Sequence, residues 1–172
     1  MTKYKIRKLS PEDWREYKTI RLESLRDAPD SFGSTLDREA SFTPEQWQSR
    51  LRVSQNTFDS VAYSAIVDHS SIGLVSCVVH ASGDESAHLY QMWVSPDFRN
   101  GGVGTALLEH AKLWANDRGV RSLLLSVTTT NSEAISLYRA AGFMPVGKTE
   151  PLRDGSVLNS QFMRLNLAAS KA

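Results

Sequence analysis

The spacing of hydrophobic and polar residues divides the first third of the chain into one strand and several helices. Hydrophobic residues alternate with basic ones over Lys3–Leu9, which predicts a short strand. A longer helix is predicted from Ser10-Pro11, because serine is a good N-cap and proline fits the first helical turn. Two short helical segments follow, at Leu36–Ser41 and from Thr43-Pro44 onward.

The rest of the chain alternates strands with two further helices. The predicted segments are a hairpin of Thr57–Val67 and Ile72–His80, a strand that ends at Val94, a helix that ends at Arg118-Gly119, a buried strand at Ser122–Val127, a helix that stops at Gly142, and a last pair of strands at Phe143–Glu150 and Val157–Leu167. Thr130 and Glu133 have the spacing of a capping box at the start of the second of these helices. This order of elements predicts an α/β fold with a mixed sheet and helices on both faces.

Length and charge restrict the class of protein. A chain of 172 residues suits one domain, which we place at 1–167 with a flexible tail at 168–172. Its 20 basic and 19 acidic residues give a net charge of +1, so neither a nucleic acid nor a membrane surface is an expected partner. The N-terminus has no apolar signal segment, and no apolar run is long enough for a membrane span. We therefore expect a cytoplasmic protein.

One cysteine, Cys77, lies in the apolar run Gly73–Val79. A single cysteine cannot form an internal disulfide, and this apolar context is typical of a small buried residue rather than of a reactive thiol. A covalent route through this cysteine is therefore not expected.

A glycine-rich turn, Arg99-Asn100-Gly101-Gly102-Val103-Gly104, stands where the fourth predicted strand gives way to a helix. Glycines let the backbone approach a ligand closely, and the first N–H groups of a helix have no internal partner. Phosphate is the expected ligand at such a site. The spacing fits neither the dinucleotide-binding turn, because Leu107 occupies its third position, nor the P-loop, which requires Gly-Lys-Ser/Thr.

The pattern Arg-x-x-Gly-x-Gly at 99–104 resembles the coenzyme A-binding turn of the GNAT superfamily of N-acetyltransferases. A second match, Asn131-x-x-Ala134-x-x-x-Tyr138-x-x-x-Gly142-Phe143, resembles the next helix and strand of that family. The resemblance is specific over 86–149 and loose over 1–42. It implies the GNAT-like acyl-CoA N-acyltransferase fold, with a central, mostly antiparallel sheet. It also implies transfer of acetyl from acetyl-CoA to a primary amine of a small molecule or peptide, by direct attack in a ternary complex and without a metal.

Particular residues acquire roles from this resemblance. Cofactor contacts are implied for Met92, Val94, Arg99, Asn100, Gly101, Gly102, Val103, Gly104, Thr105, Asn131 and Tyr138. The backbone N–H of Met92 is expected to hold the oxyanion, Val94 to bind the pantetheine arm, and Tyr138 to protonate the leaving sulfur. Arg99 alternatively pairs with Asp97 or Glu109, and Tyr138 and Asn131 alternatively serve as a core aromatic and a helix cap.

The proton acceptor and the acceptor pocket are less well defined by the sequence. His88 lies eleven residues before Arg99, where histone-acetylating members carry a glutamate, and imidazole can accept a proton at neutral pH. Glu39, Glu23 and a chain of waters are the alternatives. If the strand is regular, Tyr90 shares the face of His88.

The helical region between the first two strands lines the acceptor pocket in many family members. This makes Phe32 and Glu39 candidates for substrate binding, with a solvated Glu39 as the alternative. Arg21 on an apolar helix face is expected to form a salt bridge. Trp93 and Phe98 beside the glycine turn pack either against the cofactor or at a subunit contact, since homodimers are common in the family.

Two other classes remain to be distinguished from an enzyme of this kind. One is a GNAT-like sensor or interaction module that binds acyl-CoA without turnover, against which the presence of Tyr138 argues. The other is a nucleotide-binding enzyme, which should bind ATP or NAD more tightly than coenzyme A.

Overall fold

The order of secondary-structure elements predicted from the sequence is confirmed by the computed structural model, which describes residues 3–52 and 58–168. The elements are β1 (Lys5–Lys8), η1 (Pro11–Asp13), α1 (Trp14–Asp27), η2 (Pro29–Ser31), α2 (Leu36–Ala40), α3 (Pro44–Ser49), β2 (Asp59–Val67), β3 (Ser70–Val79), β4 (Ser86–Val94), η3 (Pro96–Phe98), α4 (Val103–Asp117), β5 (Ser122–Thr128), α5 (Ser132–Ala140), β6 (Met144–Pro151) and β7 (Asn159–Asn166). Thr57, the predicted start of the second strand, and 169–172 of the predicted tail lie outside the described residues.

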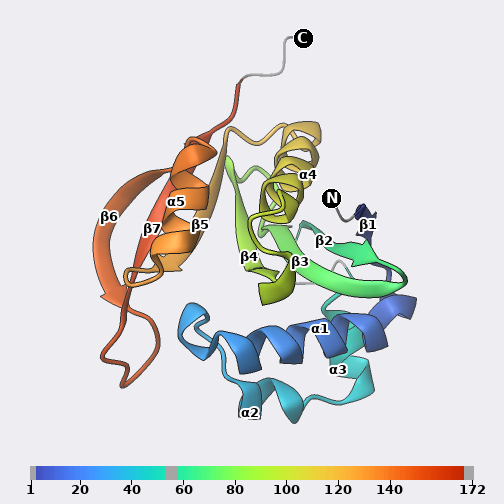
Figure 1. Cartoon of the computed structure of the whole chain (residues 1–172). Coiled ribbons are helices and arrows are strands. Elements are labelled where there is room, and N and C mark those ends of the chain that lie inside the picture. The colour runs from blue at the N-terminus through green and yellow to red at the C-terminus, as the bar shows by residue number, and fades with distance from the viewer. Residues whose placement is uncertain (1–2, 53–57, 169–172) are drawn as a thin grey trace.

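The strands form one sheet in the order β1-β2-β3-β4-β5-β7-β6. Only β4 and β5 are parallel, and the other neighbours are antiparallel. The pairing between β4 and β5 begins with Ser86 opposite Ser122 and ends with His88 opposite Leu124. Both strands continue past this point, to Val94 and Thr128, so the sheet divides between their carboxyl-terminal halves (Figure 1).

Helices cover both faces of the sheet, as predicted. Neighbouring residues of a strand point to opposite faces. Leu74 of β3 packs in one hydrophobic cluster with residues of α1 and α3, whereas the next residue, Val75, packs in another with residues of α4. The helices α1 to α3 therefore lie on one face and α4 on the other (Figure 1). Leu137 of α5 approaches Gly104 of α4, which puts α5 on the α4 face as well.

The residue types explain the position of the turn between β2 and β3 and of the start of α5. The start of α5 differs from the prediction. Asp68 and His69 both have positive φ, as a tight hairpin turn requires, so His69 is a turn residue. The capping box predicted for Thr130 and Glu133 is wrong. Asn131 is the N-cap of α5, and its Oδ1 accepts a hydrogen bond from the N–H of Ala134 at 3.1 Å. Asparagine is the stronger cap, and the helix begins one residue later than predicted.

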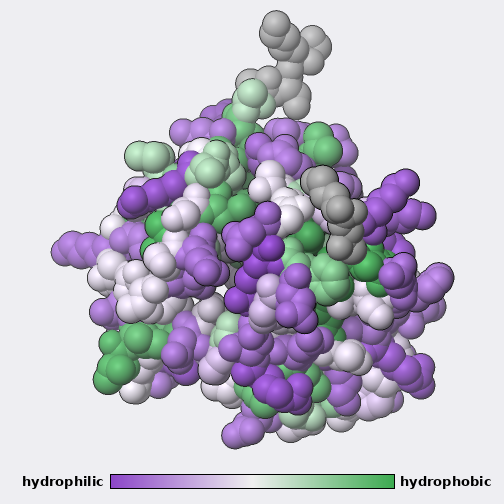
Figure 2. Space-filling view, in the orientation of Figure 1, coloured by the Kyte–Doolittle hydropathy of each residue, from purple (hydrophilic) through white to green (hydrophobic). Residues whose placement is uncertain are grey.

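Polar side chains cover most of the face seen in Figure 2, and the hydrophobic ones gather in small groups. Across residues 3–52 and 58–168, none of the helices combines the length and the hydropathy that a membrane crossing requires.

Candidate active site

A cleft of about 740 Å³ occupies the division between β4 and β5. Its walls come from the end of α1, the carboxyl-terminal halves of both strands, the glycine turn and α5. The lining residues are Ala28, Ser31, Met92, Trp93, Val94, Arg99, Asn100, Gly102, Gly104, Thr105, Ser126, Val127, Asn131, Ser132, Glu133, Ala134, Ser136, Leu137 and Tyr138. Most of the residues with an implied cofactor role are thus brought together. Gly101 and Val103 do not line the cleft, and Val103 is a core residue.

The glycine turn presents backbone donors to this cleft. Gly102 is the N-cap of α4 with φ 81°, a conformation that glycine adopts without strain. The first hydrogen bond of the helix runs from the N–H of Ala106 to the carbonyl of Gly102. The N–H groups of residues 103–105 therefore have no partner within the helix.

The surroundings of these donors suit a phosphate. A Cβ added at Gly104 would lie 3.1 Å from a methyl carbon of Leu137 and 3.4 Å from the Cε of Met92, so a side chain there would crowd the cleft. The first turn of α4 contains no acidic residue, which leaves the positive end of the helix dipole uncompensated. The turn therefore fits the pyrophosphate of coenzyme A.

Arg99 is fixed by residues that lie far from it in sequence. Its Nε donates to the carbonyl of Val94 at 2.9 Å, and its Nη2 donates to the Asp27 carboxylate at 2.7 Å. The same carboxylate accepts from the indole nitrogen of Trp93 at 2.9 Å. Asp27 thus joins the end of α1 to the strand and the turn that border the cleft. The alternatives Asp97 and Glu109 are wrong as partners of Arg99.

The backbone of β4 is irregular where it borders the cleft. Gln91 has φ 60°, and the register with β3 shifts between Leu74 and Ser76, which marks a β-bulge. A left-handed conformation of a residue other than glycine costs on the order of 1–3 kcal/mol and is concentrated at functional sites. Beyond the bulge, the N–H of Ser95 bonds to the carbonyl of Ile72, so by alternation the polar groups of Val94 face the cleft.

Tyr138 lies both in the hydrophobic core and at the cleft. Its ring packs against Phe143 with centroids 5.8 Å apart, and its side chain also lines the cleft. Burial raises the pKa of the Tyr138 hydroxyl, so this group carries its proton throughout the neutral range. Asn131 is both the cap of α5 and a cleft residue, and its Nδ2 donates to Ser31 at 3.2 Å.

His88 lies outside the cleft lining, where β4 and β5 are still paired. Its half-buried ring stacks on Tyr90, with centroids 6.2 Å apart and planes inclined by 15°, and meets the ring of His80 at 4.9 Å. The expected common face of His88 and Tyr90 is confirmed, because the bulge comes only after Tyr90. Burial and, next, the neighbouring His80 lower the pKa of His88, so the ring is neutral at pH 7.

Glu39 and Phe32 also lie outside the cleft lining. Glu39 is 0% exposed and accepts two hydrogen bonds from Arg21, at 3.0 and 2.8 Å, and one from Arg50 at 2.8 Å. The salt bridge predicted for Arg21 is confirmed, and the solvated alternative for Glu39 is wrong. Burial alone would raise the pKa of Glu39, but the hydrogen bonds and charge of Arg21 lower it overall. The Arg21 guanidinium lies 4.5 Å from the centroid of the Phe32 ring.

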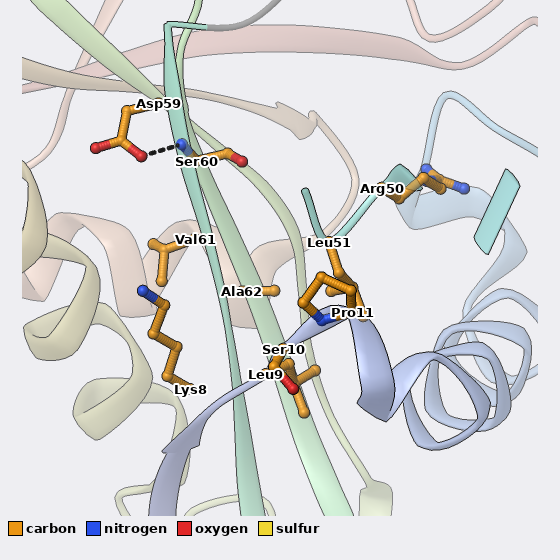
Figure 3. A pocket seen from close by; sticks show the side chains of 10 residues that line it. All are labelled: Lys8, Leu9, Ser10, Pro11, Arg50, Leu51, Asp59, Ser60, Val61 and Ala62. Carbon is orange, nitrogen blue, oxygen red and sulfur yellow. Dashed lines mark hydrogen bonds between the residues drawn. The ribbon is translucent and has the colours of Figure 1, made fainter. Parts of the chain in front are cut away.

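Two further features have no role in the cleft. Cys77 is buried in the core, as predicted, and burial raises the pKa of its thiol to about 12. A second cavity, of about 370 Å³, lies between the start of the chain and β2 (Figure 3). The carboxylate of Asp59 in its wall is already engaged by the N–H of Ser60 and by Arg118, both at 2.8 Å. The cationic side chains in its wall are those of Lys8 and Arg50.

Solved structures of similar fold include an acetyltransferase of the GNAT family from Streptococcus pneumoniae. It has a TM-score of 0.80 and 23% identity, over 96% of this chain and all of that one. Another is the PaiA N-acetyltransferase of Thermoplasma acidophilum in complex with coenzyme A, with a TM-score of 0.73 and 24% identity over 95% of this chain and 99% of that one. At these identities the likeness concerns the fold.

Sequence relatives are similar over shorter segments. Streptothricin acetyltransferase of Streptomyces lavendulae is 30% identical over 98 residues, which are 57% of this chain and 52% of that protein. The ribosomal protein bS18-alanine N-acetyltransferase of Escherichia coli K12 is 42% identical over 59 residues, 34% of this chain and 40% of that protein. The chain thus spans about half the length of these curated relatives, or less.

The family model described as the acetyltransferase (GNAT) family matches residues 14–143. This range contains the glycine turn, both strands that border the cleft, and Tyr138. The resemblance inferred from the two sequence motifs is therefore confirmed, and the chain belongs to the GNAT family of acetyltransferases.

Proposed function

We propose that this protein transfers the acetyl group of acetyl-CoA to a primary amine by direct attack in a ternary complex. The observation that carries the proposal is one continuous cleft, lined both by the start of α4, whose first N–H groups have no partner within the helix, and by Tyr138, whose hydroxyl is protonated. In the reaction, the amine nitrogen forms a bond to the thioester carbon, the carbon–sulfur bond breaks, and a proton passes from nitrogen to sulfur.

Different groups of the cleft would bind different parts of acetyl-CoA. The N–H groups of residues 103–105 would hold the pyrophosphate, and the backbone of Val94 would hold the pantetheine arm. The backbone N–H of Met92 would stabilise the oxyanion that develops on the thioester carbonyl. The pair of Asp27 and Arg99 acts through Val94 and the turn, so we regard both as positioning residues.

Two side chains, those of Tyr138 and His88, would transfer protons. Tyr138 retains its proton at neutral pH and would donate it to the leaving sulfur. His88 is neutral at pH 7 and would accept the proton of the amine through water, since its side chain stands outside the cleft lining. Each transfer of this kind typically contributes about 10²- to 10⁴-fold in rate.

The names of the relatives give two different acceptors, streptothricin and the alanine of ribosomal protein bS18. For this chain we propose a primary amine of a small molecule or a peptide as the substrate class. A cytoplasmic location, expected from the sequence, and a homodimer, expected from the family, are further parts of the proposal, and size-exclusion chromatography with light scattering tests the homodimer.

The test is release of free coenzyme A thiol from acetyl-CoA in the presence of a panel of amines and peptides. Release that depends on the amine is expected. Binding of coenzyme A without release from any acceptor would instead support a sensor.

The variant Tyr138→Phe removes the proposed acid and leaves the ring in place. We expect affinity for coenzyme A to stay within about two-fold and kcat to fall at least about 100-fold, because only the proton donor is lost. An unchanged kcat would refute the role of Tyr138 as the acid.

A further inference from the structure

Gln91, at the β4 bulge, carries an amide whose orientation is fixed by its neighbours. Its Oε1 accepts hydrogen bonds from the hydroxyl of Tyr17 at 2.8 Å and from that of Ser76 at 3.0 Å. Two O–H donors on the same oxygen turn the Nε2 group, with its two hydrogens, to the opposite side. Within residues 3–52 and 58–168, no atom accepts a hydrogen bond from this Nε2 group. The strained backbone of Gln91 therefore positions an N–H donor that the described part of the chain does not use.

The surroundings of Gln91 locate this donor beside the acetyl-transfer site. Its contacts with Tyr17 of α1 and Ser76 of β3 put its side chain on the α1 face of the sheet. The next residue, Met92, points to the other face, where it approaches Gly104 in the cleft. Pairing with β5 has already ended at His88, so at Gln91 the sheet is open on the side of the cleft. The amide thus lies on the α1 face of β4, across the strand from the cleft that Met92 lines, and Gln91 itself is not a lining residue. We take this α1 face as the side from which the amine enters.

The charges behind this face disfavour a polycation. Tyr17 packs against Trp47 with centroids 5.6 Å apart, and the guanidinium of Arg50 lies 5.7 Å from the same indole. Arg50 and Arg21 share the single carboxylate of Glu39, so the group carries one excess positive charge, with Arg21 and Glu39 buried and Arg50 exposed. An excess positive charge on the face that carries the Gln91 N–H donor favours an acceptor with an oxygen lone pair there over one with a second ammonium group.

We propose that Gln91 is a specificity-determining residue, whose Nε2 donates to a carbonyl or carboxylate oxygen on the carbon next to the acceptor amine. The acceptor is then an α-amino carbonyl compound, that is, a free amino acid or the N-terminus of a peptide, and neither a polyamine nor a simple alkylamine. This inference rests on the proposed function and names the substrate class of the same site.

The experiment compares two acceptors of similar size, alaninamide and isopropylamine, which differ in the carbonyl group. For each, kcat/KM is measured at saturating acetyl-CoA for the wild type, Gln91→Glu and Gln46→Glu. The first variant keeps the oxygen that Tyr17 and Ser76 bond but replaces the N–H donors by an acceptor. Gln46→Glu is the matched control, since Gln46 is an exposed member of the capping box of α3, where glutamate is equally suitable.

With kcat/KM referred to the concentration of unprotonated amine, we expect the wild type to favour alaninamide at least ten-fold, since a site built to bond an oxygen rejects the analogue that lacks it. Gln91→Glu should lose at least ten-fold on alaninamide and less than two-fold on isopropylamine, and Gln46→Glu should match the wild type. Tyr17→Phe, which removes one of the two groups that orient the amide, should shift the ratio of the two acceptors in the same direction. Melting curves and the affinity for coenzyme A verify that the variants are folded.

Equal losses on both acceptors, or no loss in Gln91→Glu, would overturn the inference and leave the acetyltransferase intact. Wild-type protein that binds coenzyme A but releases no thiol with either amine would overturn the proposed function, and the inference with it. Parallel assays with alanine and with a tripeptide that begins with alanine distinguish a free amino acid from a peptide N-terminus. Of these two acceptors, only alanine has a free carboxylate on the carbon that bears the amine.

Discussion

Glycines with positive φ lie at both ends of α4. Replacing each with alanine distinguishes the role of the glycine turn in coenzyme A binding from the general effect of backbone strain. Gly102, at the start, has φ 81°, and Gly119, just past the end, has φ 70°. Alanine in this region of φ costs about 1–2 kcal/mol. In a chain of this size that destabilisation lowers Tm by about 2–4 °C per kcal/mol, so each alanine variant should melt about 2–8 °C below the wild type.

Of Gly102 and Gly119, only Gly102 borders the cleft. A Cβ there would meet the hydroxyl of Tyr4 at 3.5 Å, which is an ordinary contact, so the effect of alanine is on the backbone. Relief of the strain would move the N–H groups of residues 103–105 away from their common centre. We expect Gly102→Ala to weaken binding of coenzyme A at least ten-fold, about 1.4 kcal/mol, and Gly119→Ala to leave it within two-fold.

Calorimetric titration of coenzyme A into both variants, together with thermal melts, provides the comparison. If both variants lose affinity equally, the loss arises from destabilisation and the reasoning about the turn is wrong. It is equally wrong if Gly102→Ala melts lower but binds coenzyme A as the wild type does.

Two further predictions concern buried charge. Glu39→Ala leaves Arg21, which is 3% exposed, without its carboxylate, and should cost about 3–5 kcal/mol in urea unfolding; a variant of unchanged stability but weakened acceptor binding would contradict the structural role. Because the pKa of Glu39 is lowered in the fold, its contribution is present above about pH 4.3 and is lost as the pH falls through the folded value. The pKa of His88 is also lowered, so the unfolded chain binds its proton first and stability falls as the pH drops below about 6.5. His88→Gln should reduce this loss between pH 6.5 and 5, and, if His88 is the base, should lower kcat at pH 7.5; unchanged kcat would exclude that role.

The elements of the fold could be predicted because their signals are local. Serine and proline at the start of η1, which leads directly into α1, the turn at Asp68 and His69, and the glycine after α4 each determine the backbone over a few residues. The same holds for the glycine turn, whose pattern was sufficient to indicate a phosphate ligand.

Partners that are distant in sequence could not be predicted in this way. Asp27 and Arg99 are 72 residues apart, and Tyr17 and Gln91 are 74 apart. Each pair meets only because α1 packs across the end of β4. The sequence shows an arginine that needs a partner, but several carboxylates are nearer to it along the chain. Gln91 has no residue-type signal at all, since its strained φ becomes visible only in the structure.

The central claim is that the division between β4 and β5 is a coenzyme A site, and calorimetric titration of coenzyme A into the wild-type protein tests it most directly. We predict binding at a single site that weakens as salt is added, because in this account the helix dipole and nearby charge hold the pyrophosphate. We also predict that coenzyme A binds more tightly than ATP or NAD. Absence of coenzyme A binding, or tighter binding of either nucleotide, would contradict the account.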